Sequence, residues 1–164
     1  MGFFSKKSYP QVWERYIKTF NNKVQMFSDV RFVVFDTETT GLKPQTDRIL
    51  SIGAIGIQDK KIGISDVFEY YIHQEQFSKE TVAIHGIRKS TTNKSSEKEA
   101  IYQFLDYINN AVLVGHHIQF DVAMINLSLA RLHLPKLKNT ILDTGNLHLK
   151  TFVDLPKKQH FSLD

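Results

Sequence analysis

The chain has 164 residues, of which 41% are hydrophobic and 23% charged, enough apolar material for one soluble domain with its own core. It has no cysteine, which excludes disulfides and any zinc or iron–sulfur site with cysteine ligands. The net charge of +4 favours a polyanionic partner. No apolar run approaches the roughly 20 residues needed to cross a bilayer, and no signal peptide is evident, so we expect a cytoplasmic protein without membrane contact.

The N-terminal part predicts an amphipathic helix over residues 9–27. Its apolar residues recur every three or four positions and share one helical stripe: Trp13, Ile17, Phe20, Val24 and Phe27. We expect the stripe to pack on the domain that follows. Docking of this helix on a membrane surface, a polymerase or a second copy of the chain is the alternative. The predicted organisation is an N-terminal helical extension over residues 1–28 and one domain over residues 29–164.

Five short apolar segments predict a sheet. They lie at about residues 30–35, 49–57, 64–72, 112–114 and 141–142. The first is rich in β-branched and aromatic residues, which indicates a strand buried on both faces and ending at Asp36. The second and third are separated by a polar turn and predict an antiparallel pair.

Helices are predicted between the later strands. Ser96 and Glu99 form a capping-box pair ahead of an apolar periodic segment, which predicts a helix beginning near Glu97. A second periodic segment, opened by Asp121, runs until Pro135 stops it. A further helix is expected after residue 145. Three strands followed by alternating helices and strands predict an α/β fold, in which helices pack against a mixed sheet.

The first predicted strand ends in two acidic residues. Asp36 and Glu38 are two positions apart, so both side chains point to the same side of an extended strand. Two like charges this close raise each other's pKa unless a cation neutralises them. Mg²⁺ or Mn²⁺ suits carboxylate oxygens. A solvated strand end is the other interpretation.

Asp121 is a third acidic candidate. It opens a helix just after the fourth strand, where strand ends and helix N-termini converge on ligand sites in α/β folds. A third carboxylate there would complete a cage of oxygen ligands for a metal ion. An ordinary helix-initiating aspartate is the other interpretation.

Three parts of the sequence resemble the DEDD-type 3′-to-5′ exonucleases, whose fold is RNase H-like. They are residues 35–42, the blocks 85–87 and 115–121, and residues 142–144. Within this family the sequence is most similar to the proofreading epsilon subunits of bacterial DNA polymerase III. The resemblance implies a mixed five-stranded sheet flanked by helices.

The resemblance also implies an activity. Asp36, Glu38 and Asp121 would hold two Mg²⁺ or Mn²⁺ ions and hydrolyse terminal phosphodiesters at single-stranded DNA or RNA 3′ ends. The products would be nucleoside 5′-monophosphates, and a DNA polymerase is an implied partner in proofreading or repair. Glu38 would also grip the terminal nucleotide, and the Leu42 side chain would wedge against its base. The other substrate-binding residues implied are Thr37, Thr39, His85, His117 and Phe120.

Several of these neighbours have a structural interpretation as well. His85 would contact substrate or cap the following helix, and Phe120 is of a type more often found in a core. His117 stands where the family frequently has Asn. We do not predict zinc at His116 and His117, because adjacent histidines diverge and no accompanying ligand pattern is present. We expect Asp143 to order a turn.

The family also uses a general-base His and a fourth metal-binding Asp, five positions apart, beyond a Ser-Leu-Asp segment. Here residues 162–164 form that segment, so His160 and Asp164 receive no catalytic role. We therefore expect a C-terminally truncated domain lacking its last helix and nearly inactive alone, since losing a general base costs about 10²- to 10⁴-fold in rate. The alternative function is a non-catalytic nucleic-acid-binding or scaffolding module.

Overall fold

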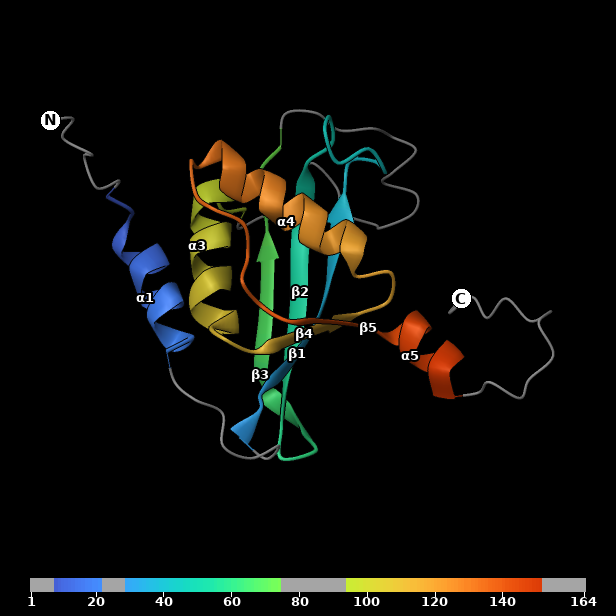
Figure 1. The fold of residues 1–164 in the computed structure, drawn as a ribbon. Coiled ribbons are helices and arrows are strands. Elements are labelled where there is room, and N and C mark those ends of the chain that lie inside the picture. The colour runs from blue at the N-terminus through green and yellow to red at the C-terminus, as the bar shows by residue number, and fades with distance from the viewer. Residues whose placement is uncertain (1–7, 22–28, 75–93, 152–164) are drawn as a thin grey trace, which may run out of the picture.

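The computed structural model describes residues 8–21, 29–74 and 94–151, and a five-stranded sheet lies at its centre (Figure 1). The strands are β1 (Phe32–Thr39), β2 (Ile49–Gln58), β3 (Lys61–Tyr71), β4 (Val112–Gly115) and β5 (Ile141–Asp143). Their order is β3-β2-β1-β4-β5. β2 is antiparallel to β1 and β3, whereas β4 is parallel to β1 and β5. The predicted mixed sheet is confirmed.

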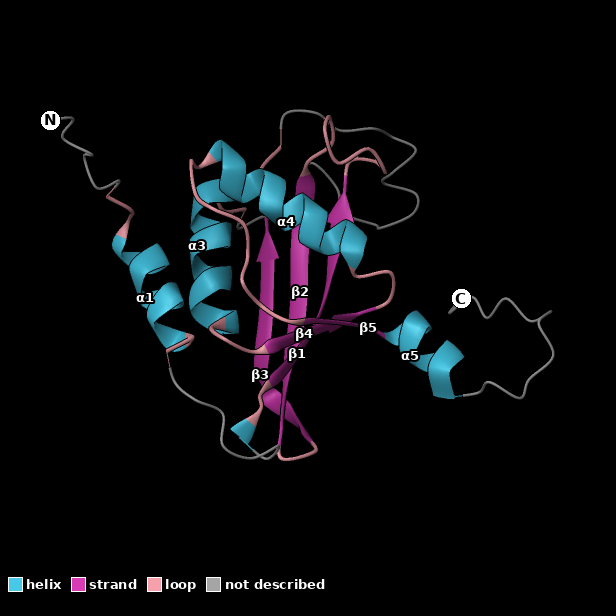
Figure 2. Ribbon diagram, in the orientation of Figure 1, coloured by secondary structure: helices cyan, strands magenta, loops and turns pink. Residues whose placement is uncertain are grey.

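The described helices are α1 (Gln11–Thr19), α3 (Glu97–Ile108), α4 (Gln119–Arg131) and α5 (Thr144–Thr151). Figure 2 shows α3 and α4 lying over the same face, with α1 outside α3 and α5 beyond β5. α3 begins as predicted, because the Ser96 hydroxyl accepts the N–H of Glu99 at 3.2 Å. None of the described helices is long and apolar enough to span a bilayer.

Strand β1 differs from its prediction in two ways. It continues to Thr39 instead of ending at Asp36, because Asp36 pairs with Gly53 and Glu38 with Ser51 of β2. It is also not buried on both faces. Its residues alternate between buried and more exposed positions, because in the described part of the chain helices pack on one side of the sheet only. Polar side chains can therefore occupy the open side without interrupting the strand.

Helix α1 packs on the core of the domain, as predicted. Trp13 is 4% exposed and Tyr16 is fully buried, and Arg15 forms a salt bridge with Asp106 of α3 at 2.5 Å. Ile17 and Phe20 lie partly buried against the same core. The described part of the apolar stripe is thus covered by this chain. Val24 and Phe27 lie outside the described residues, and the boundary after residue 28 stays a prediction.

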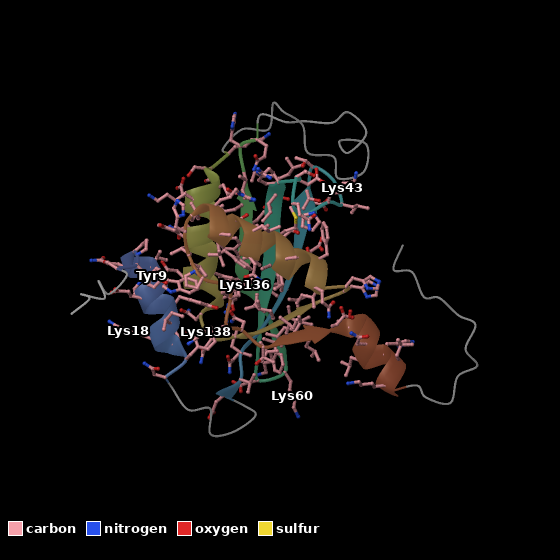
Figure 3. The ribbon with its side chains drawn as sticks, turned by 45° about the horizontal axis from the view of Figure 1, so that its top comes forward. Tyr9, Lys18, Lys43, Lys60, Lys136 and Lys138 are labelled. Atoms are coloured by element: carbon pink, nitrogen blue, oxygen red, sulfur yellow. The ribbon has the colours of Figure 1, made fainter. Side chains whose placement is uncertain are left out.

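The hydroxyl of Tyr16 joins α1 to the loop that precedes β5. It donates to Oδ1 of Asn139 and accepts the N–H of Lys138, both at 2.7 Å, and Figure 3 shows Lys138 beside α1. Burial raises the pKa of Tyr16 to about 12, so the hydroxyl stays protonated at neutral pH. This one oxygen satisfies two polar groups at the packing surface.

We expect Tyr16→Phe to lower the free energy of unfolding by about 1–3 kcal/mol, because it leaves two partly buried polar groups without their partner. Urea denaturation monitored by circular dichroism measures this change. The matched control is Tyr102→Phe on α3, since Tyr102 lies partly buried against the core. A Tyr16→Phe effect no larger than that of the control would contradict the assigned role of the hydroxyl.

Candidate active site

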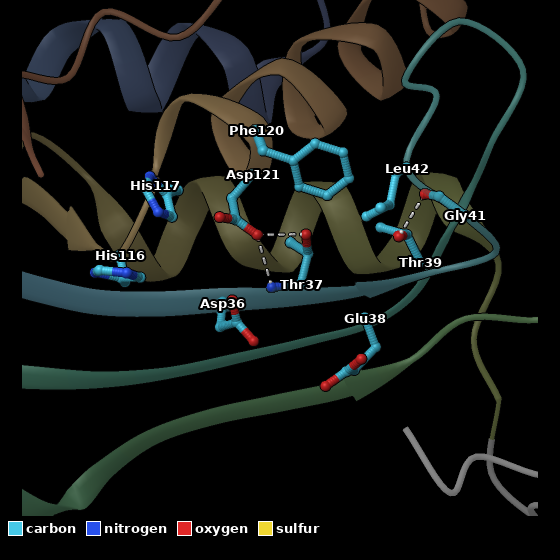
Figure 4. A pocket seen from close by; sticks show the side chains of 10 residues that line it. All are labelled: Asp36, Thr37, Glu38, Thr39, Gly41, Leu42, His116, His117, Phe120 and Asp121. Carbon is cyan, nitrogen blue, oxygen red and sulfur yellow. Dashed lines mark hydrogen bonds between the residues drawn. The ribbon is translucent and has the colours of Figure 1, made fainter. Parts of the chain in front are cut away.

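A cavity of about 530 Å³ lies between β1, the loop that follows it and the beginning of α4 (Figure 4). β1 and α4 meet there because β4, which leads into α4, runs parallel to β1. The cavity brings together residues that are 85 positions apart in sequence. Its lining residues are Asp36, Thr37, Glu38, Thr39, Gly41, Leu42, His116, His117, Phe120 and Asp121.

The paired acids of β1 lie as their spacing predicts. Asp36 and Glu38 project from the same side of the strand, whereas Thr37 between them points to the helix side (Figure 4). Asp36 is exposed and Glu38 is half-buried. Strand alternation, which the β1–β2 pairing maintains up to Glu38, therefore presents two carboxylates at one edge of the cavity.

Asp121 lies across Thr37 from these two acids. It is 4% exposed, and its Oδ1 accepts the N–H of Thr37 at 3.0 Å and the Thr37 hydroxyl at 2.6 Å. The pKa of Asp121 is raised to about 6, mainly by burial and in part by the nearby charge of Asp36, against the two bonds from Thr37, which lower it. The ionised form of Asp121 is therefore poorly stabilised by the protein alone.

The chemistry of these donors fits a hard divalent cation. All three acids supply oxygen ligands, which Mg²⁺ and Mn²⁺ prefer, and a cation would offset the unfavourable charge of Asp121. Within residues 8–21, 29–74 and 94–151, however, no three His, Asp or Glu side chains already form a group able to hold an ion. Metal binding by Asp36, Glu38 and Asp121 stays a prediction.

The residues predicted to bind substrate lie at the same cavity, with one exception. Thr37, Thr39, Leu42, His117 and Phe120 all line it, whereas His85 is outside the described residues. Leu42 is 84% exposed, and the Thr39 hydroxyl donates to the carbonyl of Gly41 at 2.8 Å. Phe120 is partly buried against the core, so it serves the core and the cavity wall together.

The two adjacent histidines do not diverge as expected. Their ring centroids are 4.3 Å apart, and His117 has a left-handed backbone with a φ of 51°. Nδ1 of His116 lies 3.3 Å from the Thr144 hydroxyl. His116 and Gly41 line the cavity although the sequence assigned them no role. The position of His116 between a predicted strand and Asp121 is the sequence signal that could have placed it at the cavity.

Asp143 orders the turns around this loop, in agreement with the prediction. Its carboxylate accepts the N–H of Asn146 at 3.0 Å and that of Ile118 at 3.1 Å. The bond from Asn146 is the main reason that the pKa of Asp143 lies below its usual value. Asp143 therefore ties the start of α5 to the loop that carries both histidines.

Comparison with known families identifies the class of protein. The RNase_T family model, described as Exonuclease, matches residues 33–163, and the chain belongs to this family. The resemblance to the DEDD exonucleases with an RNase H-like fold is therefore confirmed.

Curated relatives include two PolC-type DNA polymerases III. That of Caldanaerobacter subterraneus subsp. tengcongensis is 38% identical over 135 residues, covering 81% of this chain and 9% of the relative. That of Thermotoga petrophila is 34% identical over 142 residues, covering 84% of this chain and 10% of the relative. The chain thus spans about a tenth of the length of these relatives.

Solved structures of exonuclease I share the fold. An ExoI/SSB-Ct complex has a TM-score of 0.69 at 16% identity, covering 82% of this chain and 32% of that chain. E. coli exonuclease I in complex with a dT13 oligonucleotide has a TM-score of 0.68 at 16% identity, covering 82% of this chain and 32% of that chain. At this identity the likeness establishes the RNase H-like fold.

Proposed function

We propose that this domain is a metal-dependent 3′-to-5′ exonuclease that releases nucleoside 5′-monophosphates from single-stranded DNA. The observation that carries the proposal is the cavity in which three acids from β1 and α4 meet an exposed leucine and an aromatic ring. Membership of the exonuclease family supports the reaction class. The dT13 complex of E. coli exonuclease I supports DNA as the substrate, and RNA ends are the alternative substrate.

A DNA polymerase is the proposed partner. The relatives that support it carry the name DNA polymerase III PolC-type, and proofreading or repair at a polymerase would supply frayed 3′ ends. A cytoplasmic location follows from the same proposal.

Each part of the cavity has a role in this reaction. Asp36, Glu38 and Asp121 would hold two divalent ions, which when bound activate water and stabilise the leaving 3′ oxygen. Thr37 fixes the Asp121 carboxylate through its N–H and its hydroxyl. Leu42 and Phe120 offer apolar surface against which the terminal base can pack.

A non-catalytic nucleic-acid-binding module is the second candidate. It is favoured by one observation, that the three carboxylates do not already form an ion-binding group within the described residues. It predicts salt-sensitive DNA binding without nucleotide release. That binding would survive the double substitution Asp36→Ala/Glu38→Ala, because phosphate contacts would come from basic residues.

End-labelled oligonucleotides distinguish the two candidates. With Mg²⁺ or Mn²⁺ and a version of the chain extended through the last helix that the family resemblance implies, we expect 3′-labelled single strands to release labelled mononucleotide at once and 5′-labelled strands to shorten stepwise. DNA and RNA oligomers compared in parallel identify the preferred polymer, and omission of the metal should stop release.

The decisive variant is Asp36→Ala. We expect it to lower the rate of release at least about 100-fold, because several kcal/mol of metal-dependent stabilisation corresponds to such a factor. Asp59→Asn is the control, since it also removes one negative charge but lies in the β2–β3 turn, at the other end of β2. Nucleotide release by Asp36→Ala at the wild-type rate would contradict the proposed exonuclease activity.

A further inference from the structure

The loop between β1 and β2 holds an apolar side chain out into solvent beside the acidic cavity. Leu42 is 84% exposed and lines the cavity. A leucine in this position loses contact with water only when a ligand covers it. Its contribution to binding therefore depends on how firmly the loop holds it in place, because ordering a mobile loop on binding reduces affinity.

A single carboxylate connects the two ends of this loop. Oδ1 of Asp47 accepts the hydroxyl of Thr40 at 3.0 Å, and Oδ2 accepts the N–H of Lys43 at 2.7 Å. These two partners lie on either side of Gly41 and Leu42 in the sequence. The Thr40 hydroxyl oxygen also accepts the N–H of Arg48 at 3.0 Å, which extends the connection to the beginning of β2.

Gly41 allows the carboxylate to come this close. A Cβ atom at Gly41 would lie 2.7 Å from Oδ2 and 2.9 Å from Oδ1 of Asp47, closer than van der Waals contact permits. The Asp47 carboxylate is therefore packed directly against the backbone that precedes Leu42. Asp47 itself is half-buried and is not among the residues that line the cavity.

We propose that Asp47 is a positioning residue that holds Leu42 against the terminal base of a single-stranded nucleic acid. It acts through the loop and makes no contact with the ligand. The Lys43 backbone takes part, whereas its side chain lies at the surface of the molecule (Figure 3). This proposal deepens the proposed function and rests on it.

The test is a double-mutant cycle on oligonucleotide binding with the full 164-residue chain. The probe is a short 5′-fluorescein-labelled single-stranded oligothymidylate with Ca²⁺, followed by fluorescence anisotropy. We expect Leu42→Ala and Asp47→Ala each to weaken binding about tenfold, the factor for losing much of one buried leucine side chain. The double variant should bind no more weakly than Leu42→Ala, because Asp47 acts through Leu42.

Two further variants separate positioning from general destabilisation. Asp47→Asn retains one acceptor oxygen and should give an intermediate affinity, which also covers the case in which Asp47→Ala fails to fold. Asp59→Asn, with the same loss of charge in the distant β2–β3 turn, should bind like the wild type. Thermal unfolding of each variant identifies any loss of the whole fold.

The outcomes are distinguishable. Wild-type affinity in both Asp47 variants, or additive effects in the double variant, would overturn the positioning role and leave the proposed function intact. Failure of the wild-type chain itself to bind the oligonucleotide would overturn the proposed function and the positioning role together.

Discussion

Replacing Asp121 with Asn is expected to stabilise the fold at pH 8 and to lower nucleotide release at least about 100-fold. Asp121 is a buried acid whose pKa is raised to about 6 from 3.8, so the folded state binds its proton more tightly than the unfolded state does. The contribution of Asp121 to the free energy of unfolding therefore falls as the pH rises from about 4 to about 6 and stays reduced above that range. An Asn side chain retains an oxygen acceptor for Thr37 and carries no charge.

Urea denaturation at two pH values measures this effect. At pH 8 the gain in the free energy of unfolding should be at most about 3 kcal/mol, and near pH 4 it should largely disappear. Asp59→Asn serves as the control and should leave the pH dependence of the wild type unchanged. Equal stability of Asp121→Asn and wild type at pH 8 would show that the buried charge carries no penalty.

Divalent cations provide a second measurement on the same variant. Mg²⁺ or Mn²⁺ should raise the thermal unfolding temperature of the wild type, because a ligand bound only by the folded state stabilises it. Asp121→Asn should show a smaller shift, since the site loses one charged ligand. This comparison does not depend on catalytic turnover.

Phe104→Ala is expected to lower the free energy of unfolding by about 3–5 kcal/mol, the range for removing a fully buried phenylalanine. Phe104 on α3 is completely buried. The centroid of its ring lies 5.3 Å from the ring centroid of Phe35 on β1 and 5.5 Å from that of Phe68 on β3. Because Phe35 directly precedes Asp36, this contact also supports the strand that carries the acidic pair.

Chemical denaturation measures this loss in the free energy of unfolding, and two further variants serve as comparisons. Phe104→Leu keeps most of the side-chain volume and should lose less than about 1.5 kcal/mol. Phe20→Ala removes an equal number of atoms from a partly buried position at the end of α1, so its loss should be smaller than that of Phe104→Ala. Similar losses at both phenylalanines would contradict the central place of Phe104 in the core.

Much of the fold could be predicted because its signals are local. The capping pair at Ser96 and Glu99 and the polar turn after β2 lie next to the elements they delimit. The end of β1 could not be read in the same way. In the sequence Asp36 and Glu38 interrupt an apolar run, yet pairing with β2 continues to Thr39, and that pairing is a tertiary property.

The candidate site followed a similar division. The common side of Asp36 and Glu38 follows from strand alternation, and the meeting with the segment around Asp121 followed from the family resemblance. The ring contact of His116 and His117 and the left-handed backbone of His117 are conformations that the sequence does not specify. The role of Asp47 depends on a close approach to Gly41 that becomes visible only in three dimensions.

The parallel pairing of β1 with β4 has a consequence for folding during synthesis. Phe32 pairs with Val112 and Val34 with Val114. The cavity therefore cannot assemble until the chain as far as Asp121 has emerged from the ribosome. Such long-range pairing forms late because a large loop must close first. A nascent or partly unfolded copy therefore holds its acids apart, and any hydrolytic capacity of this domain is confined to molecules that have finished folding.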